Sequence, residues 1–212
     1  MSKSRLALMT SVFVGFGCVG LLHASKRAPV ERVCAPATAD ADAPALTDHL
    51  PNIPLTTQEG QRVCFYDDLV KGRIVTINFM YTACTGICPR ETANLVQVQR
   101  LLGDRVGRDI RMLSISLEPD QDTPAALRAY AARHKVKPGW TFLTGKKEDI
   151  ERLRRKLGVY DPDPVVDQDK TQHAGLLVMG NEPTGRWLVQ PALLAPADLV
   201  WTLHRVIDSR QS

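Results

Sequence analysis

The chain has 212 residues, of which 44% are hydrophobic and 24% charged, and its formal net charge is +4 at pH 7. This length and composition suit one well-packed domain and are too small for two large ones. The basic residues are spread along the chain rather than interleaved with aromatic residues, which argues against a nucleic-acid-binding surface. We therefore expect one globular core and no nucleic-acid partner.

The first segment of the chain is apolar. Lys3 and Arg5 precede an uncharged, mostly apolar run over residues 6–22, which has about the minimum length for a membrane span. A long signal peptide would look similar, but the sequence around Ala24 makes a poor cleavage site and favours a retained anchor. We expect residues 1–25 to be a membrane anchor or signal segment, with the remaining chain in the periplasm or an equivalent compartment.

A linker and then a folded domain are expected after this segment. Residues 26–45 are rich in Ala, Pro and Asp and have no apolar period, which is typical of a flexible tether. The domain itself is expected over residues 46–212. It begins with a predicted hairpin whose arms are residues 53–57 and 62–66, with a Glu-Gly turn between them.

The stretch that follows carries two closely spaced cysteines. A β-prone apolar run over residues 73–80 leads to Cys84 and Cys88, and Pro89 suits the first turn of a helix that ends at Gly103. If that helix forms, the Cα atoms of the two cysteines can lie about 6 Å apart, given a rise of about 1.5 Å per residue. This distance allows either a disulfide or one shared metal ion. The free N–H groups at a helix N-terminus also favour the thiolate form of both sulfurs.

The rest of the chain alternates between strand and helix patterns. In order, it predicts a buried strand (110–117), a helix starting at Asp122-Thr-Pro (122–135), a short strand (140–143), a charged helix (147–157), a loop (161–172), a hairpin (174–179 and 186–190) and an amphipathic helix (196–207). Such an order indicates an α/β sandwich of thioredoxin type with an N-terminal hairpin extension. The run of basic residues at 152–156 is interpreted as a solvated helix face, and the long loop as a functional or mobile segment.

Two sulfurs need a third donor to make a soft-metal site, and the chain offers five histidines. His134 and His204 fall on predicted amphipathic helices, where a surface or packing role is expected. His173 differs, because it follows the long loop and begins a buried strand. In a thioredoxin arrangement the loop before that strand faces the N-terminus of the first helix, although a histidine that only caps the strand remains an alternative. Two thiolates with an imidazole suit Cu(I) or Zn.

Four motif-bearing segments occur in a fixed order along the chain. They are residues 79–89 with a CxxxCP motif, residues 114–124 ending in Asp-Thr-Pro, residues 140–145, and Gln172-His-Ala at the start of a strand. This arrangement resembles the Sco/SenC family of copper-binding thioredoxin-fold proteins over about residues 50–208. The resemblance implies that Cys84, Cys88 and His173 are the ligands of a copper ion, as Cu(I) or also as Cu(II).

The chain departs from the usual family pattern near these ligands. Relatives commonly have Pro after the first cysteine and an acidic residue between the two, whereas residues 85–87 here are Thr, Gly and Ile. Relatives also commonly have Val-Asp before the histidine, where this chain has Thr171-Gln172. Asp169 is the nearest acid upstream and could serve instead. The departures keep the three ligands and bear on metal affinity and partner choice.

The resemblance implies a function as well. It indicates a copper metallochaperone, rather than an enzyme, that delivers copper to the dinuclear copper centre of a haem-copper (cytochrome c) oxidase at the periplasmic face of the bacterial inner membrane. Its partners would be the copper-receiving subunit of the oxidase and another periplasmic copper chaperone or a thiol reductant.

Two alternatives use the same residues. One is a thiol-disulfide reductase with Cys84 and Cys88 as its redox pair, and the other is a redox or copper sensor. The spacing argues against ordinary thioredoxin chemistry, which uses CxxC. A peroxidase is disfavoured because two cysteines, not one, lie within a single helical turn.

Cys34 and Cys64 remain outside this site. An oxidising compartment would permit a disulfide between them. Because Cys34 lies in the predicted tether and Cys64 on a predicted strand, we favour a buried, unpaired Cys64 instead.

Overall fold

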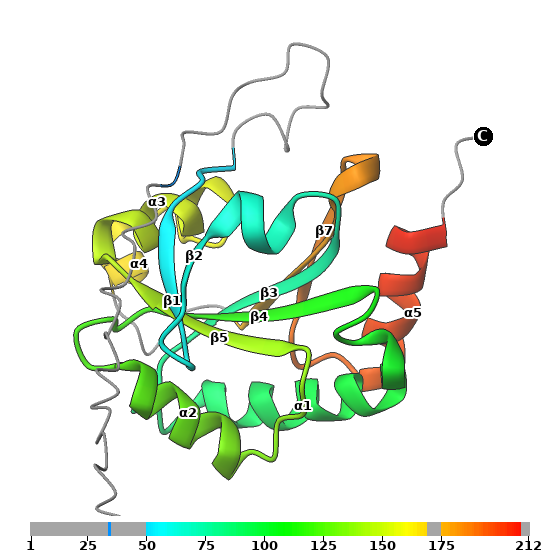
Figure 1. The fold of residues 1–212 in the computed structure, drawn as a ribbon, viewed down its shortest axis with the longest axis horizontal. Coiled ribbons are helices and arrows are strands. Elements are labelled where there is room, and N and C mark those ends of the chain that lie inside the picture. The colour runs from blue at the N-terminus through cyan, green and yellow to red at the C-terminus, as the bar shows by residue number, and fades with distance from the viewer. Residues whose placement is uncertain (1–33, 35–49, 169–174, 209–212) are drawn as a thin grey trace, which may run out of the picture. The chain divides into compact units, whose positions relative to one another are not determined.

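The computed structural model describes residues 34, 50–168 and 175–208, and in this part of the chain it shows one seven-stranded mixed sheet flanked by helices (Figure 1). The strand order is β2-β1-β5-β4-β3-β6-β7. The strands are β1 (Pro54–Thr57), β2 (Arg62–Cys64), β3 (Ile74–Met80), β4 (Ile110–Ser116), β5 (Trp140–Gly145), β6 (Leu176–Asn181) and β7 (Arg186–Pro191). β3, β4 and β5 are parallel, and the two hairpins β1-β2 and β6-β7 add antiparallel strands on either side. The predicted α/β sandwich with an N-terminal hairpin is confirmed.

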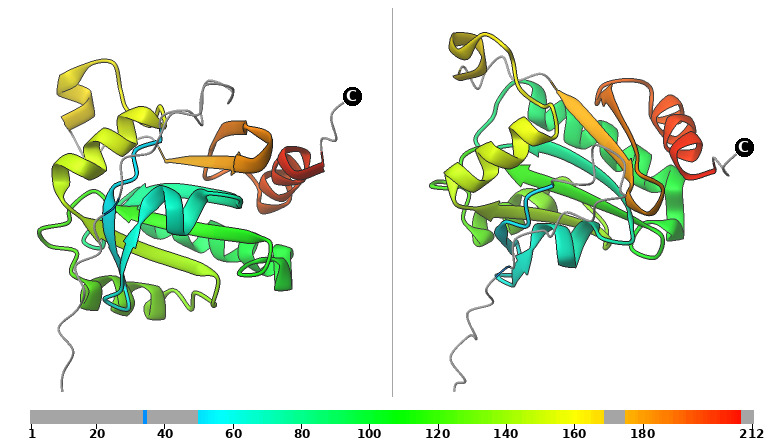
Figure 2. Two further views of the ribbon diagram at one scale, coloured as in Figure 1. Left: turned by 45° about the horizontal axis from the view of Figure 1, so that its top comes forward. Right: turned by 90° about the horizontal axis from the view of Figure 1, so that it is seen from above.

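Helices cover both faces of this sheet (Figure 2). On one face, α1 (Ile87–Leu102), α2 (Pro124–Arg133) and α5 (Pro196–Asp208) enclose one hydrophobic core, and on the other, η1 (Phe65–Val70) and α3 (Lys147–Lys156) enclose a second. Successive side chains of β3 point to opposite faces, as the two-residue period of a strand requires. Ile77 and Phe79 accordingly belong to the second core, whereas Met80 belongs to the first, beside the cysteines.

The predicted helix boundaries rest on local signals that the structure confirms. Gly103 follows α1 with a φ of +56°, a conformation that glycine adopts without steric cost. Thr123 is the N-cap of α2, and its hydroxyl oxygen accepts a hydrogen bond from the backbone N–H of Ala126 at 3.2 Å. Pro124 takes the first helical position, as expected.

The second arm of the predicted hairpin ends earlier than expected. β2 stops at Cys64, and the chain then forms the π-helical turn η1. The amide oxygen of Asn52 accepts hydrogen bonds from the N–H groups of Tyr66 (3.1 Å) and Asp67 (3.2 Å), and the Asp68 carboxylate accepts one from the N–H of Cys64 (2.7 Å). These polar contacts bend the backbone away from the strand, so the strand prediction for residues 65–66 is wrong.

A disulfide joins Cys34 to Cys64, with their Cα atoms 5.5 Å apart. Cys64 is buried as expected, but it is not the unpaired cysteine that the sequence favoured. The pairing depends on where the segment before the domain runs, and no local pattern in the sequence reports that path. Residues 1–25 and 26–45, apart from Cys34, lie outside the described residues, so the anchor and the tether stay predictions. No helix among the described residues is long and apolar enough to cross a membrane.

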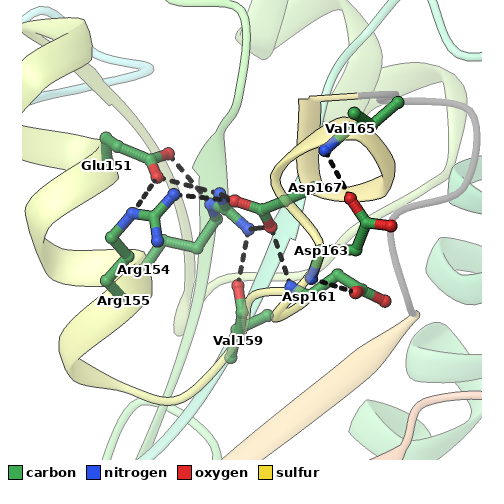
Figure 3. A network of polar contacts seen from close by, with 8 residues as sticks. All are labelled: Glu151, Arg154, Arg155, Val159, Asp161, Asp163, Val165 and Asp167. Atoms are coloured by element: carbon green, nitrogen blue, oxygen red, sulfur yellow. Dashed lines mark hydrogen bonds and ion pairs between the residues drawn. The ribbon is translucent and has the colours of Figure 1, made fainter.

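The predicted loop after α3 contains a short helix, α4 (Pro164–Gln168), held by ion pairs (Figure 3). The guanidinium of Arg154 donates to both carboxylate oxygens of Asp167 (2.7 and 2.6 Å) and to the backbone oxygen of Val159 (2.8 Å). Glu151 also binds Arg154, at 2.9 and 3.1 Å. Arg154 is therefore buried, and the interpretation of residues 152–156 as a solvated face is wrong at this position.

The Asp167 carboxylate organises the turn as well as the ion pair. It accepts a hydrogen bond from the backbone N–H of Asp161 at 2.8 Å, and Asp163 caps Val165 in the same segment (2.9 Å). Hydrogen bonds from Arg154 hold the pKa of Asp167 down at about 2, so this carboxylate is ionised through the ordinary pH range. The loop prediction fails for residues 164–168 because charge pairing orders a segment that has no apolar period.

Candidate metal centre

Cys84 and Cys88 lie where the chain passes from the carboxyl end of β3 into α1. Gly86 is the N-cap of α1, and Pro89 is the third helical residue, which removes one of the N–H groups that would otherwise lack a partner there. The Cys84 N–H donates to the backbone oxygen of Tyr81 at 3.3 Å, which closes the turn before the helix. Both cysteines are buried and free of disulfide bonds. The structure thus confirms the predicted strand, loop and helix around the pair.

A buried carboxylate fixes the loop that carries Cys84. Asp122 is fully buried, and it accepts hydrogen bonds from the backbone N–H of Thr82 (3.1 Å), from the Thr82 hydroxyl and from the Ser116 hydroxyl (2.6 Å). The contact joins the loop after β3 to the end of β4. Because a buried carboxylate is stable only when its oxygens are satisfied, loop and carboxylate stabilise each other.

The two sulfurs hydrogen-bond to each other but hold their protons unequally. Burial raises the pKa of the Cys84 thiol, yet hydrogen bonds from Cys88, from the Gly86 backbone and from the Tyr81 hydroxyl outweigh it, and the pKa is lower than usual. Burial raises the pKa of Cys88 well above its usual value, the negative charge of Cys84 adds to this, and a backbone hydrogen bond from Tyr81 only partly opposes it. Cys84 therefore loses its proton first.

Two tyrosines border the pair. Burial and the hydrogen bond to Cys84 raise the pKa of Tyr81 to about 12, so its hydroxyl stays protonated and remains a donor to the sulfur. Tyr130 is buried, and its hydroxyl lies 2.8 Å from the Thr92 hydroxyl of α1. Burial likewise raises the pKa of Tyr130 to about 12. Both side chains add polar but uncharged groups around the sulfurs.

Glu91 lies one turn after Cys88 and is only 1% exposed. Neither of its carboxylate oxygens has a hydrogen-bond partner among the described residues. Burial raises the pKa of Glu91 to about 7. Buried ionisable groups with shifted pKa values are found at functional sites, so Glu91 is a candidate member of this one.

The structure tests only part of the predicted ligand set. It brings Cys84 and Cys88 together, whereas His173 and Asp169 lie outside the described residues. No cluster of three or more potential His, Cys, Asp or Glu ligands occurs within the described residues. His134 has a packing role, since its ring lies 4.4 Å from the ring of Tyr130 and burial lowers its pKa. The assignment of His173 therefore stays a prediction.

The comparison with known proteins decides the family. A family model described as SCO1/SenC matches residues 43–193, which is well over half of the chain. The chain belongs to the SCO1/SenC family.

Individual members of the family support this membership. A Bacillus subtilis "SCO1 protein homolog" is 33% identical over 101 residues, which cover 47% of this chain and 51% of that protein. The structure of Bradyrhizobium japonicum ScoI with copper bound is 28% identical, covers 72% of this chain and 96% of that one, and has a TM-score of 0.58. The fold also matches BsSco, described as a Sco-family cytochrome c oxidase assembly protein with a disulfide switch (24% identity, 76% and 94% coverage, TM-score 0.61). The chain thus spans about half the length of the B. subtilis relative it matches.

The residues of this member of the SCO1/SenC family fit a soft monovalent cation. Two buried sulfurs at a helix N-terminus are donors that Cu(I) prefers. The helix N-terminus also stabilises the net negative charge that two thiolates and one Cu(I) leave. The unpartnered carboxylate of Glu91 shows a polar position beside the pair that the described residues do not satisfy.

Sequence reasoning missed Asp122 and Glu91. The sequence placed Asp122 only at the start of a predicted helix, and its role depends on a contact across 40 residues. A signal for Glu91 did exist. The buried stripe of α1 runs through Cys88, Glu91, Leu95, Val98 and Leu102, so a glutamate occupies a core position of the helical period.

Proposed function

We propose that this chain is a copper chaperone that binds one Cu(I) through Cys84, Cys88 and His173 and delivers it to the dinuclear copper centre of a haem-copper oxidase. The observation that carries the proposal is the pair of buried, hydrogen-bonded sulfurs at the N-terminus of α1, which no disulfide joins. The copper-bound ScoI relative and the assembly role given for BsSco support it.

Loading follows from the unequal thiols. Cys84, with its lowered pKa, offers the first thiolate, and Cu(I) bound there displaces the proton of Cys88, whose pKa is raised mainly by burial. Cu(I) with two thiolates carries a net charge of −1. The free N–H groups of the first turn of α1 stabilise that charge without providing a further ligand.

Release requires that a partner's thiols replace the ligands one at a time. We propose that His173 dissociates first, because a neutral imidazole holds Cu(I) less strongly than a thiolate does. The receiving partner would be the copper-binding subunit of the oxidase, met at the periplasmic face of the inner membrane. Residues 6–22 would anchor the chain there, and another copper chaperone or a thiol reductant would reload it.

A competition titration of the full-length chain against a chromophoric Cu(I) chelator tests the ligand set. We expect one Cu(I) per wild-type chain, and loss of tight binding in each of the variants Cys84→Ser, Cys88→Ser and His173→Ala. His204→Ala is the matched histidine control and should bind as the wild type does. Wild-type affinity in His173→Ala would move the third ligand elsewhere, with Asp169 next to test.

The thiol-disulfide reductase remains a second candidate, and the unequal proton affinities of Cys84 and Cys88 favour it, because they separate an attacking from a resolving sulfur. In such a reaction both thiols would pass two electrons and two protons to a partner disulfide. Two separate mixtures distinguish the two functions. Reduction of the oxidised receiving subunit by the copper-free chain would support the reductase, and transfer of Cu(I) from the copper-loaded chain to the reduced subunit would support the chaperone.

A further inference from the structure

Asp122 is a carboxylate that the fold buries completely and yet supplies with hydrogen-bond donors. It is 0% exposed and lies just before Thr123, the N-cap of α2. The backbone N–H of Thr82 lies 3.2 Å from one of its oxygens and 3.1 Å from the other, and the hydroxyl groups of Thr82 and Ser116 donate to it as well. Thr82 belongs to the loop between β3 and α1, whereas Ser116 ends β4. One side chain therefore ties the carboxyl ends of β3 and β4 to the start of α2.

Backbone hydrogen bonds fix the turn on which Asp122 stands. Its N–H donates to the backbone oxygen of Glu118 at 2.8 Å, and the N–H of Glu118 donates to the hydroxyl oxygen of Ser116 at 2.9 Å. The N–H of Leu117 donates to the backbone oxygen of Met80 at 2.8 Å, which joins the same turn to the end of β3. Asp122 is thus held by its own surroundings, and the loop after β3 is what its carboxylate holds.

The two cysteines of the candidate metal centre depend on different supports. Cys88 is the second residue of α1, so the helix itself sets its position. Cys84 precedes the N-cap Gly86 and lies in the loop, where the residues on either side of it are exposed. Thr82 is two residues before Cys84, and two residues span at most about 7 Å. Fixing Thr82 therefore limits where the Cys84 sulfur can lie relative to Cys88.

We propose that Asp122 is the positioning residue of the Cys84–Cys88 pair, and that its hydrogen bonds to Thr82 set how tightly the pair binds copper. The inference rests on the function proposed above, in which this pair holds Cu(I). Functional side chains must be held within about 0.5 Å of their productive geometry by the groups around them. A loop that is already fixed loses less conformational entropy when the metal binds, so the affinity rises. Asp122 acts through the loop and not as a ligand.

Two matched variants of the full-length chain separate this role from simple satisfaction of the carboxylate. Thr82→Val removes a hydroxyl donor from the loop at nearly equal volume, and Ser116→Ala removes one from β4. A competition titration against a chromophoric Cu(I) chelator should show about tenfold weaker binding in Thr82→Val, the lower end of the usual effect of losing a group that orients a ligand. Ser116→Ala leaves the loop contacts in place and should weaken binding less, although Ser116 is the more deeply buried residue. Thr82→Ser keeps the hydroxyl and should bind as the wild type does.

Asp122→Asn tests the acceptor itself. The amide keeps one acceptor oxygen and replaces the other with a donor, so the N–H and hydroxyl of Thr82 compete for a single oxygen. We expect a larger loss of copper affinity than in Thr82→Val. Adding Thr82→Val to Asp122→Asn should then cost less affinity than it costs in the wild type, because the two changes break the same contact. Denaturant unfolding checks that each variant is folded, and if Asp122→Asn is not, the comparison of Thr82→Val with Ser116→Ala decides alone.

Amide hydrogen exchange in the copper-free chain gives a second measurement that needs no metal. Exchange over residues 82–86 should be faster in Thr82→Val than in Ser116→Ala, because only the first change loosens the loop. Equal copper affinities in these two variants, or equal exchange in this loop, would overturn the role of Asp122 and leave the copper site as proposed. Absence of Cu(I) binding by the wild-type chain would overturn the proposed function, and the exchange rates would still decide whether Asp122 holds the loop.

Discussion

Two cysteine pairs among the described residues behave in opposite ways. Cys34 and Cys64 are 30 residues apart and bridged, at the edge of the sheet where β2 ends. Cys84 and Cys88 are four residues apart and buried at the N-terminus of α1, and they are called the free pair only because no disulfide joins them. The two cysteines that are closer in the sequence are thus the ones without a disulfide bond.

The difference lies in what surrounds the sulfurs. Around the free pair, hydrogen bonds from the backbone of α1 and from Tyr81 lower the pKa of Cys84, while burial raises that of Cys88. Cys34 and Cys64 have no thiol to ionise, because their sulfurs are bonded to each other, and this bond ties Cys34 to strand β2. One pair therefore cross-links the fold, and the other keeps its two thiols.

The largest effect is expected when Cys84 and Cys88 are oxidised to a disulfide, as Cys34 and Cys64 already are. Diamide accepts two electrons and two protons from Cys84 and Cys88 and leaves one S–S bond, and only thiolates bind copper well. We expect copper stoichiometry to fall from one per chain to zero on oxidation and to return on reduction. Mass spectrometry verifies the bridge, and full stoichiometry in a chain with both sulfurs bridged would contradict the prediction. Cys34→Ser/Cys64→Ser should respond in the same way, because its oxidation involves the same pair.

A smaller effect is expected when the disulfide between Cys34 and Cys64 is removed. The bridge closes a loop of about 30 residues, and its removal should lower the free energy of unfolding by about 3 to 4 kcal/mol in the chain-entropy account. Denaturant unfolding of Cys34→Ser/Cys64→Ser against the wild type measures this. Copper affinity should stay the same, since Cys64 ends β2, which three strands of the sheet separate from β3, the strand that leads to Cys84 and Cys88. Loss of copper binding with unchanged stability would reverse the roles assigned to the two pairs.

Local sequence patterns predicted most of the fold around the free pair. The apolar strand before Cys84, Pro89 in the first helical turn and Gly103 at the helix end are signals that act within a few residues, and the structure confirms each of them. The bridge to Cys34 left no such signal, because it depends on the path of a segment without period.

The other wrong predictions, and the residues missed at the site, likewise depend on contacts that no local sequence pattern reports. The turn at η1 and the helix α4 form through side-chain contacts of Asn52 and Asp167 with distant or charged groups, which override strand or loop propensity. Asp122 acts across 40 residues from Thr82. Glu91 was visible in the helical period, but only the structure shows that its carboxylate has no partner among the described residues.

The smallest effect concerns the difference in thiol reactivity between Cys84 and Cys88. Iodoacetamide reacts with thiolates, and Cys84 combines a lowered pKa with 8% exposure, whereas Cys88 has a raised pKa and is fully buried. We expect Cys84 to be alkylated at least about tenfold faster than Cys88 at pH 7 to 8, as measured by peptide mapping of the copper-free chain. Since the pKa of Cys84 is below that of Cys88, the ratio should shrink as the pH rises and Cys88 begins to ionise. Cys88→Ala removes a hydrogen bond that lowers the Cys84 pKa and should slow alkylation of Cys84 near neutral pH, whereas equal rates at both sulfurs across this range would mean that their environments are equivalent.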